Sequence, residues 1–302
     1  MALYKYTSTN FSEIKEKPFK LEREIQQMFE TNLSQIMSLE MVKSEFTIKD
    51  RRIDTLAFDP QSKAFVIIEY KRERNSSVID QGFTYLSLML QNQADFILEY
   101  NETRSKNLKR DDVDWSQTKV LFVSQGFTPN QREAVNFKDL SIELWEVKRY
   151  ENDIVTITPI RKTHASASIK TVMQNSQELK EITDKIIEYS EENLLNGKSD
   201  DVTELYESYK NAILNLDTNI EVKPQKLYIA FKKANANICS IKPQKEGIKI
   251  VINVSQGHLD DSKQLTRDVS SIGHHGSGDY AIKVSDTKYL EYIMSLIKQA
   301  IK

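Results

Sequence analysis

Residues 51–71 read RRIDTLAFDPQSKAFVIIEYK, and this is the most informative stretch of the chain. Two β-rich segments flank a turn at 59–63 that contains Asp, Pro and Ser, a pattern typical of a β-hairpin. Charged residues interrupt the apolar pattern, one before the turn and two at the end of the second segment: Asp54, Glu69 and Lys71. A charge at the end of a buried strand costs free energy unless it is paired or binds a metal. These three residues therefore mark a candidate site.

The expected hairpin brings the charged residues together. Side chains alternate along a strand, so Glu69 and Lys71 share one face while Tyr70 points to the other. A turn centred near Gln61 places Asp54 close to opposite Glu69, where Cβ atoms are about 4.5–5.5 Å apart. Two carboxylates at that separation are able to bind one divalent cation. A slip of one residue would put them on opposite faces, so this prediction depends on the register.

The residue types indicate which cation fits. Carboxylate ligands with no Cys or His nearby favour Mg²⁺ or Mn²⁺ over Zn²⁺. Lys71 would be the cation beside the metal, where it orients a water molecule and offsets charge on a phosphate. The simpler alternative is an ordinary edge-strand acid at Asp54 and a surface ion pair between Glu69 and Lys71.

The order Asp54, then Glu69-Tyr70-Lys71, resembles the PD-(D/E)xK nuclease superfamily, with Ile53-Asp54 in place of the family's Pro-Asp. The resemblance covers about residues 14–150. It implies a restriction-endonuclease-like fold of the α/β class, in which helices flank a mixed sheet. It also implies that Asp54 and Glu69 hold the metal, that the Tyr70 carbonyl is a further ligand, and that Lys71 activates or positions the attacking water.

A second match lies downstream. Gln81-Gly82-Phe83-Thr84-Tyr85 resembles the Gln-xxx-Tyr element of RecB-like nucleases. The i,i+4 spacing, within a helix expected over Val78–Leu90, puts Gln81 and Tyr85 on one face, from which they would place a nucleic-acid backbone. Taken singly, Gln81 fits a solvated helix residue and Tyr85 a core aromatic. Arg72 and Arg74, which lead out of the motif strand, are the other predicted nucleic-acid contacts.

A third match lies upstream, where residues 21–29 resemble the first helix of the family, whose acid completes the metal site. Glu22 lies on the same helical stripe as Ile25 and Phe29, whereas Glu24 lies further round towards solvent. We therefore predict that Glu22 orients the site or holds a second ion. The alternative is a plain acid on the helix surface.

Composition bounds the class of protein. A length of 302 residues predicts about two domains, and 39% hydrophobic with 28% charged residues is enough to build cores. No apolar run reaches the ~20 residues of a membrane span, and the start has no signal-peptide core, so we expect a cytoplasmic protein with no membrane partner. Cys239 is the only cysteine, which excludes an intrachain disulfide and a Cys-rich zinc site. The net charge of −2 requires that positive charge be concentrated locally if the protein binds nucleic acid.

The rest of the chain predicts the domain organisation. Strands are expected at Thr118–Ser124, Ser141–Val147 and Ile154–Ile160, which gives a nuclease-like domain over 1–163. A small, polar stretch at 164–177 indicates a linker. Residues 178–302 predict a smaller α+β domain of helices, strands and a closing helix, with Asp200 or Asp201 as the N-cap of its helix from Val202.

The second half resembles a domain of unknown function that occurs at the C-terminus of such nucleases, sometimes labelled a predicted transport protein. Three segments carry this resemblance: Tyr228–Lys232, Ile248–Val254 and Ile272–Tyr280. Nothing in the sequence would span a membrane, so transport has no support. In the last segment the glycines would let backbone amides approach a phosphate, and His274, His275 and Asp279 are candidates for a metal; the alternative is a flexible turn that needs glycine.

These observations predict a metal-dependent nuclease, a hydrolase acting on phosphodiester bonds, with DNA as the favoured substrate. The alternative is a non-catalytic nucleic-acid-binding or regulatory protein that retains the nuclease fold. A third interpretation places the main activity in the second domain as a ligand- or protein-binding module. That domain would select the substrate, form a homodimer or bind a further partner, although no dimer seam is evident in the sequence.

Overall fold

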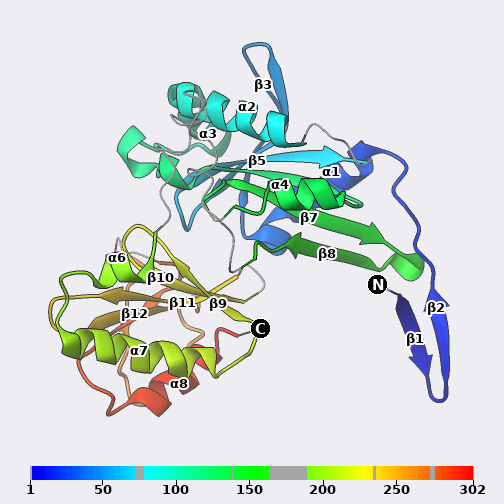
Figure 1. The fold of residues 1–302 in the computed structure, drawn as a ribbon. Helices are drawn as coiled ribbons and strands as arrows, with labels where there is room; N and C mark the ends of the chain where they lie inside the picture. Colours follow the sequence, from blue (N-terminus) through cyan, green and yellow to red (C-terminus); the bar gives the residue numbers. More distant parts are fainter. Residues whose placement is uncertain are drawn as a thin grey trace. The chain divides into compact units, whose positions relative to one another are not determined.

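The computed structural model describes residues 2–72, 78–137, 139–163, 189–233, 236–272 and 276–301. The chain divides into two compact units, Met1–Glu188 and Tyr189–Lys302 (Figure 1). The predicted linker at 164–177 lies outside the described residues, as does the start of the predicted second domain at 178–188.

The first unit is built on a six-stranded mixed sheet with the order β3-β4-β5-β6-β7-β8. Neighbours β3, β4 and β5 are antiparallel, β5, β6 and β7 are parallel, and β8 is an antiparallel edge strand. The predicted mixed sheet is therefore confirmed. The strands are β3 (Glu40–Ile48), β4 (Arg51–Asp59), β5 (Ala64–Lys71), β6 (Lys119–Ser124), β7 (Ile142–Arg149) and β8 (Val155–Ile160).

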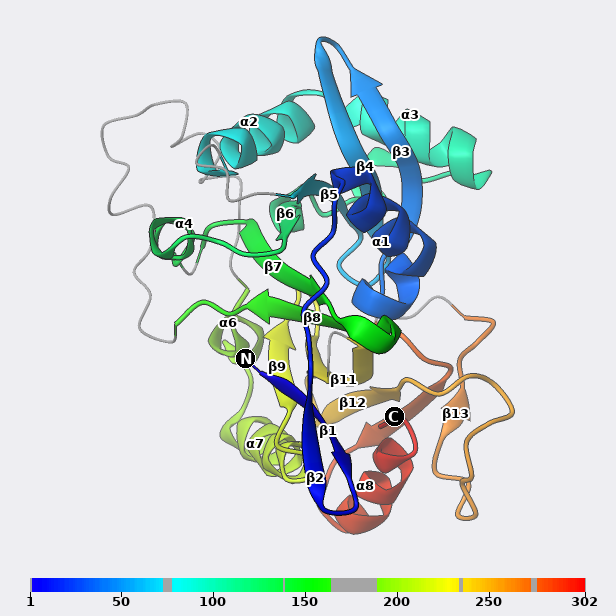
Figure 2. The same cartoon turned by 90° about the vertical axis from the view of Figure 1, so that its right-hand side faces the viewer.

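Helices cover both faces of this sheet (Figures 1 and 2). On one face α1 (Glu22–Met37) packs Ile25 and Phe29 against Ile68 and Tyr70. The opposite face, which carries Phe65 and Ile67, is covered by α2 (Val78–Gln91), α3 (Gln93–Arg104) and α4 (Pro129–Ala134). Because β5 is buried on both faces, it is a continuous apolar run until Glu69. That is why the charges at its end stand out in the sequence.

Some elements of this unit are not apparent in the sequence pattern. Strand β3 is one, and residues 86–100, which fit a helix or a helix-to-strand run, prove to be helical in two pieces, α2 and α3. An N-terminal hairpin forms a separate two-stranded sheet. Its strands are β1 (Leu3–Thr7) and β2 (Asn10–Ile14), and short 3₁₀ turns lie at Arg110–Asp112, Trp115–Gln117 and Glu151–Asp153.

The second unit is a six-stranded antiparallel sheet with helices on one face, which confirms the expected smaller α+β domain. The strand order is β13-β14-β12-β11-β10-β9. The helices are α6 (Glu191–Leu195), α7 (Asp200–Leu214) and α8 (Leu290–Lys298). The strands are β9 (Ile220–Pro224), β10 (Ile229–Lys233), β11 (Ala236–Pro243), β12 (Ile248–Ile252), β13 (Arg267–Asp268) and β14 (Tyr280–Val284).

One prediction for this unit is wrong: the N-cap of α7 is Ser199, not Asp200 or Asp201. Ser199 has extended backbone and its side chain accepts a hydrogen bond from the backbone N–H of Val202. Both aspartates lie instead in the first turn, where their negative charge interacts favourably with the helix dipole. None of the described helices combines the length and the apolar character needed to cross a bilayer.

Candidate active site

The β4–β5 hairpin has the register that its turn predicts. Pairing runs from Asp59 opposite Ala64 to Thr55 opposite Ile68, so continuing it by one step would place Asp54 opposite Glu69. At that step the Asp54 side chain replaces the backbone pairing between the strands, because the Tyr70 N–H donates to Asp54 Oδ2 at 3.0 Å. The carboxylate of Asp54 is thus fixed at the point where the two strands separate.

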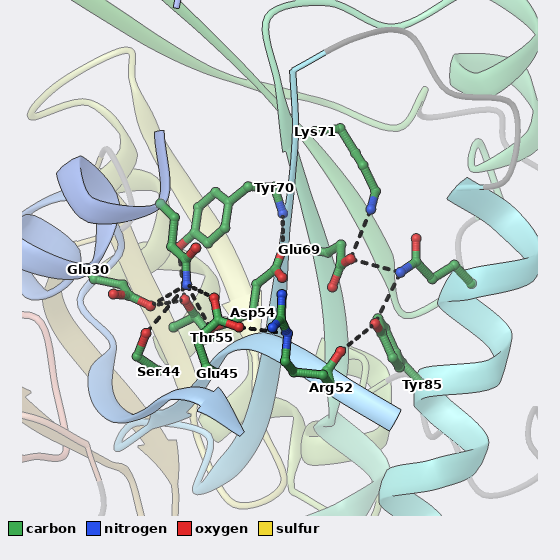
Figure 3. Close-up of polar contacts among 12 residues, drawn as sticks. Glu30, Ser44, Glu45, Arg52, Asp54, Thr55, Glu69, Tyr70, Lys71 and Tyr85 are labelled. Carbon is green, nitrogen blue, oxygen red and sulfur yellow. Dashed lines mark hydrogen bonds and ion pairs between the residues drawn. The ribbon is translucent and has the colours of Figure 1, made fainter. Parts of the chain in front are cut away.

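Glu69 is only 5% exposed, and its two carboxylate oxygens differ (Figure 3). Oε1 accepts hydrogen bonds from Lys71 Nζ at 2.9 Å and from Gln81 Nε2 at 2.8 Å. Oε2 is buried and has no hydrogen-bond partner within the described part of the chain. A buried oxygen of a carboxylate without a partner is costly and rare in native proteins. Its environment therefore suits a cation.

Helix α2 holds Glu69 in place through an amide and a phenol. Gln81 Nε2 also donates to Tyr85 Oη at 3.0 Å, and the Tyr85 hydroxyl donates to the Arg52 carbonyl at 3.2 Å. The two side chains lie one helical turn apart, so a single helix face links β4 to the end of β5. Gly82 lets the same helix pack closely against β7, since a Cβ there would lie 2.4 Å from Ile142 Cδ1.

Burial and charge make the site electronegative. Burial, together with the negative charge of Glu69, raises the pKa of Asp54 to about 7. The hydrogen bond from the Tyr70 N–H and the positive charge of Lys71 oppose this shift. With both acids ionised, a single lysine leaves one negative charge uncompensated, which a divalent cation would neutralise.

The donor set fits Mg²⁺ or Mn²⁺. Mg²⁺ is commonly held by one or two carboxylates and completes its shell with water and substrate phosphates. Within the described ranges no three His, Cys, Asp or Glu side chains group around one point, so Asp54 and Glu69 would be the two carboxylates. The N–H and carbonyl of one residue point to the same edge of an extended strand, and the Tyr70 N–H faces Asp54. The Tyr70 carbonyl therefore stays the predicted third protein oxygen.

Helix α1 meets the site through a residue that the sequence pattern did not single out. Glu22 Oε1 accepts from the backbone N–H of Arg72 at 3.0 Å, which fastens the chain just past β5. One turn later Gln26, only 8% exposed, donates from Nε2 to the Asp54 carbonyl at 3.0 Å. The role of Glu22 at the metal stays a prediction. The sequence does contain one signal for Gln26: it is a polar residue between Ile25 and Phe29 on the face of α1 that is buried.

Glu45 is a second residue that the sequence pattern did not single out. It has a φ of 53° in the middle of β3, a conformation that costs free energy for a residue other than glycine. Its carboxylate accepts from Gln26 Nε2 at 3.0 Å and pairs with Arg52 Nε at 2.7 Å. Its charge contributes to the raised pKa of Asp54. The strained strand thus places a further acid close to Gln26 and Asp54.

The remaining candidates, Arg72 and Arg74 for nucleic acid and the second-unit residues for a metal, have other partners or are not described. Arg72 Nη1 donates to the Lys20 carbonyl at 3.1 Å, so its guanidinium helps to anchor the start of α1. Arg74, His274 and His275 lie outside the described residues. Asp279 Oδ2 accepts from the backbone N–H of Gln256 at 2.8 Å, an ordinary loop contact.

Comparisons with known proteins match both halves of the chain. Residues 191–302 match the model of a domain of unknown function, DUF5655. An uncharacterized protein of Haemophilus influenzae is 53% identical over 302 residues, covering 100% of each chain. Two solved structures match 44% of this chain at 16% identity. They are an EndoMS–dsDNA complex (TM-score 0.30, 48% of that chain) and a repair endonuclease from Pyrococcus abyssi (TM-score 0.26, 50% of that chain). The chain thus spans about half the length of each.

Proposed function

We propose that this chain, which belongs to the same family as the uncharacterized Haemophilus influenzae protein, is a metal-dependent nuclease that hydrolyses phosphodiester bonds in DNA. The observation that carries the proposal is the buried, unpartnered Oε2 of Glu69 at the strand end that also holds Asp54 and Lys71. Two acids that would hold a divalent cation, with one lysine beside them, suit metal-assisted hydrolysis of a phosphodiester bond.

In this proposal Asp54 and Glu69 hold Mg²⁺ or Mn²⁺, with the Tyr70 carbonyl as a further ligand. When bound, the cation would polarise a phosphate oxygen and lower the pKa of a bound water. The Tyr70 N–H keeps the Asp54 carboxylate directed towards the site through its 3.0 Å hydrogen bond. Lys71 Nζ lies 2.9 Å from Glu69 Oε1, from where it orients the attacking water and offsets charge on the phosphate.

Gln81 and Tyr85 act on the site through Glu69. The Gln81 amide occupies Oε1 together with Lys71, which leaves Oε2 as the oxygen available to a cation. The Tyr85 hydroxyl accepts a hydrogen bond from the same amide and so holds it in this orientation. We therefore assign Gln81 a positioning role, in addition to its predicted contact with the nucleic-acid backbone.

The experiment that tests the proposal uses a matched pair of substitutions on one strand pair. Asp54→Asn changes the candidate ligand, whereas Asp50→Asn makes the same chemical change at an exposed position between β3 and β4. Purified wild type, Asp54→Asn and Asp50→Asn are incubated with labelled single-stranded, duplex and branched DNA and Mg²⁺ or Mn²⁺. We expect cleavage by wild type and Asp50→Asn, and a loss of about 10²-fold or more in Asp54→Asn.

Direct binding of Mn²⁺, followed by its electron paramagnetic resonance, provides a readout that does not require turnover. Asp54→Asn should lose the site that wild type and Asp50→Asn retain. Cleavage by purified Asp54→Asn at the wild-type rate would contradict the assignment. Binding of DNA by wild type without cleavage under either metal would favour the non-catalytic alternative.

A further inference from the structure

The sheet of the second unit has a second face, opposite α7 and α8. On three neighbouring strands the isoleucines Ile241, Ile250 and Ile282 pack into the core beneath those helices. Side chains alternate along a strand, so the residue next to each isoleucine points to the opposite face. These neighbours are all basic: Lys242 on β11, Lys249 on β12 and Lys283 on β14.

The three lysines form a row across the sheet. Lys242 lies directly opposite Lys249, and Lys249 directly opposite Lys283. Arg267, on β13, pairs with Ala281 on the same face, two residues along the strand from Lys283. Strands are about 4.8 Å apart, so the row spans roughly 10 Å. Directly opposed like charges destabilise a sheet, so folding alone gives no reason for this arrangement.

Nothing described in the chain neutralises the row. Other basic residues of the unit pair with acids, as Lys233 does with Asp217 at 2.9 Å and Lys210 with Glu191 at 2.6 Å. No such pair involves the lysines of the row or Arg267 in the described segments. Burial lowers the pKa of Lys249, and the charges of Lys242, Lys283 and Arg267 lower it further.

We propose that the row formed by Lys242, Lys249 and Lys283, with Arg267 beside it, binds the phosphate backbone of DNA. The identity of the polyanion rests on the proposed nuclease function, and the surface would hold the substrate that the first unit cuts. Phosphates of one DNA strand are about 3.4 Å apart along the helix axis, so a 10 Å row of charges faces roughly three of them. Lysine binds phosphate as a point charge, so this contact adds affinity without reading sequence.

The test measures DNA affinity in the full chain without cleavage. The parent is Asp54→Asn in the presence of EDTA, and the test variant adds Lys242→Gln, Lys249→Gln and Lys283→Gln. A matched control adds Lys198→Gln, Lys226→Gln and Lys298→Gln, which remove the same charge from α6–α7, β9–β10 and α8 positions of the same unit. Binding of a labelled duplex is followed by fluorescence anisotropy over a series of salt concentrations.

We expect the test variant to bind about tenfold or more weakly at roughly 0.1 M salt, and its plot of log affinity against log salt to be less steep by about 2 to 3. The control should follow the parent. The melting temperature of the test variant should equal or exceed that of the parent, because like charges have been removed from opposed positions.

Three results would overturn the inference: equal affinity and salt slope in parent and test variant, no binding of DNA by the parent, or row-dependent binding of anionic lipid vesicles but not of DNA. The outcome is separable from the proposed function. A wild type that cuts DNA, with a test variant that binds like the parent, refutes the row alone. A wild type that cuts nothing, with the expected change in slope, refutes the nuclease and leaves the row.

Discussion

The chain carries uncompensated charge of opposite sign in two places, and the surroundings of the two differ. At the end of β5 the charge is negative and buried, and Lys71 and Gln81 fix the orientation of Glu69. On the second sheet the charge is positive and lies at the surface, with Lys249 half-buried and Lys283 exposed, and no described acid pairs with either. A buried charge is costly and has a defined geometry, so it selects a small partner such as a metal ion. Surface charges cost little and define no geometry, so they select a large polyanion.

The largest expected difference between the two regions is in the kinetics of Glu69→Gln and Lys283→Gln. Glu69→Gln keeps the shape of the side chain but removes the ligand charge, so kcat should fall by about 10³-fold or more. Lys283→Gln should leave kcat within about twofold and raise KM a few-fold, because it removes one phosphate contact. Steady-state kinetics on one duplex substrate measures both. If both variants changed only KM, the distinction between a chemical site and a holding surface would be wrong.

The pH dependence of stability should expose the buried site. The pKa of Asp54 is about 7 in the fold against about 3.8 in the unfolded chain. Between these values the folded state binds more protons, so metal-free stability should fall as pH rises from about 4 to 7 and then level off. Asp54→Asn removes that dependence, and its stability gain at pH 8 should reach up to about 4 kcal/mol. Urea unfolding in EDTA at pH 5 and pH 8 measures it. An equal effect of the substitution at both pH values would show that Asp54 ionises normally.

Gln81→Leu tests how Glu69 is held. The substitution removes the amide that joins Glu69 to Tyr85, so we expect a loss of about 1–2 kcal/mol in stability and about tenfold in kcat. Gln91→Leu, at the exposed end of the same helix, is the control and should change neither. Gln81→Glu should not restore kcat, because it adds a negative charge beside Glu69. A Gln81→Leu enzyme with unchanged kcat would limit Gln81 to a structural role.

Sequence alone predicted the part of the site that local rules determine. The alternation of a strand and one turn are enough to place Asp54, Glu69 and Lys71 near one another, and the i,i+4 spacing puts Gln81 and Tyr85 on one helix face. That this face meets Glu69 was implied by the family resemblance and not by a local rule. All five lie within 32 residues, from 54 to 85, and the observed contacts join residues on two paired strands and the next helix.

Long-range docking determines the rest, and no local pattern reports it. Which turn of α1 faces Asp54 depends on where the helix packs, so the contact between Gln26 and the Asp54 carbonyl, across 28 positions of sequence, has no local signature. A glutamate with positive φ has no signature in residue type, which hid Glu45. The lysine row needs Lys249 and Lys283 in register on β12 and β14, and β14 does not stand out in the sequence.

The smallest expected effect is on stability, and its sign is opposite to that of Gln81→Leu at the buried site. Lys249→Met replaces the central lysine of the row and removes its repulsion with Lys242 and Lys283. We expect stability to rise by roughly 0.5 kcal/mol, within the range for one cross-strand pair, while DNA affinity falls. Lys298→Met, an exposed position on α8, should change neither. Urea unfolding at low and high salt measures the difference, which should shrink as salt screens the row. If Lys249→Met were less stable than wild type at low salt, packing of the lysine stem would outweigh the repulsion. The row would then not be a source of unfavourable charge repulsion in the fold.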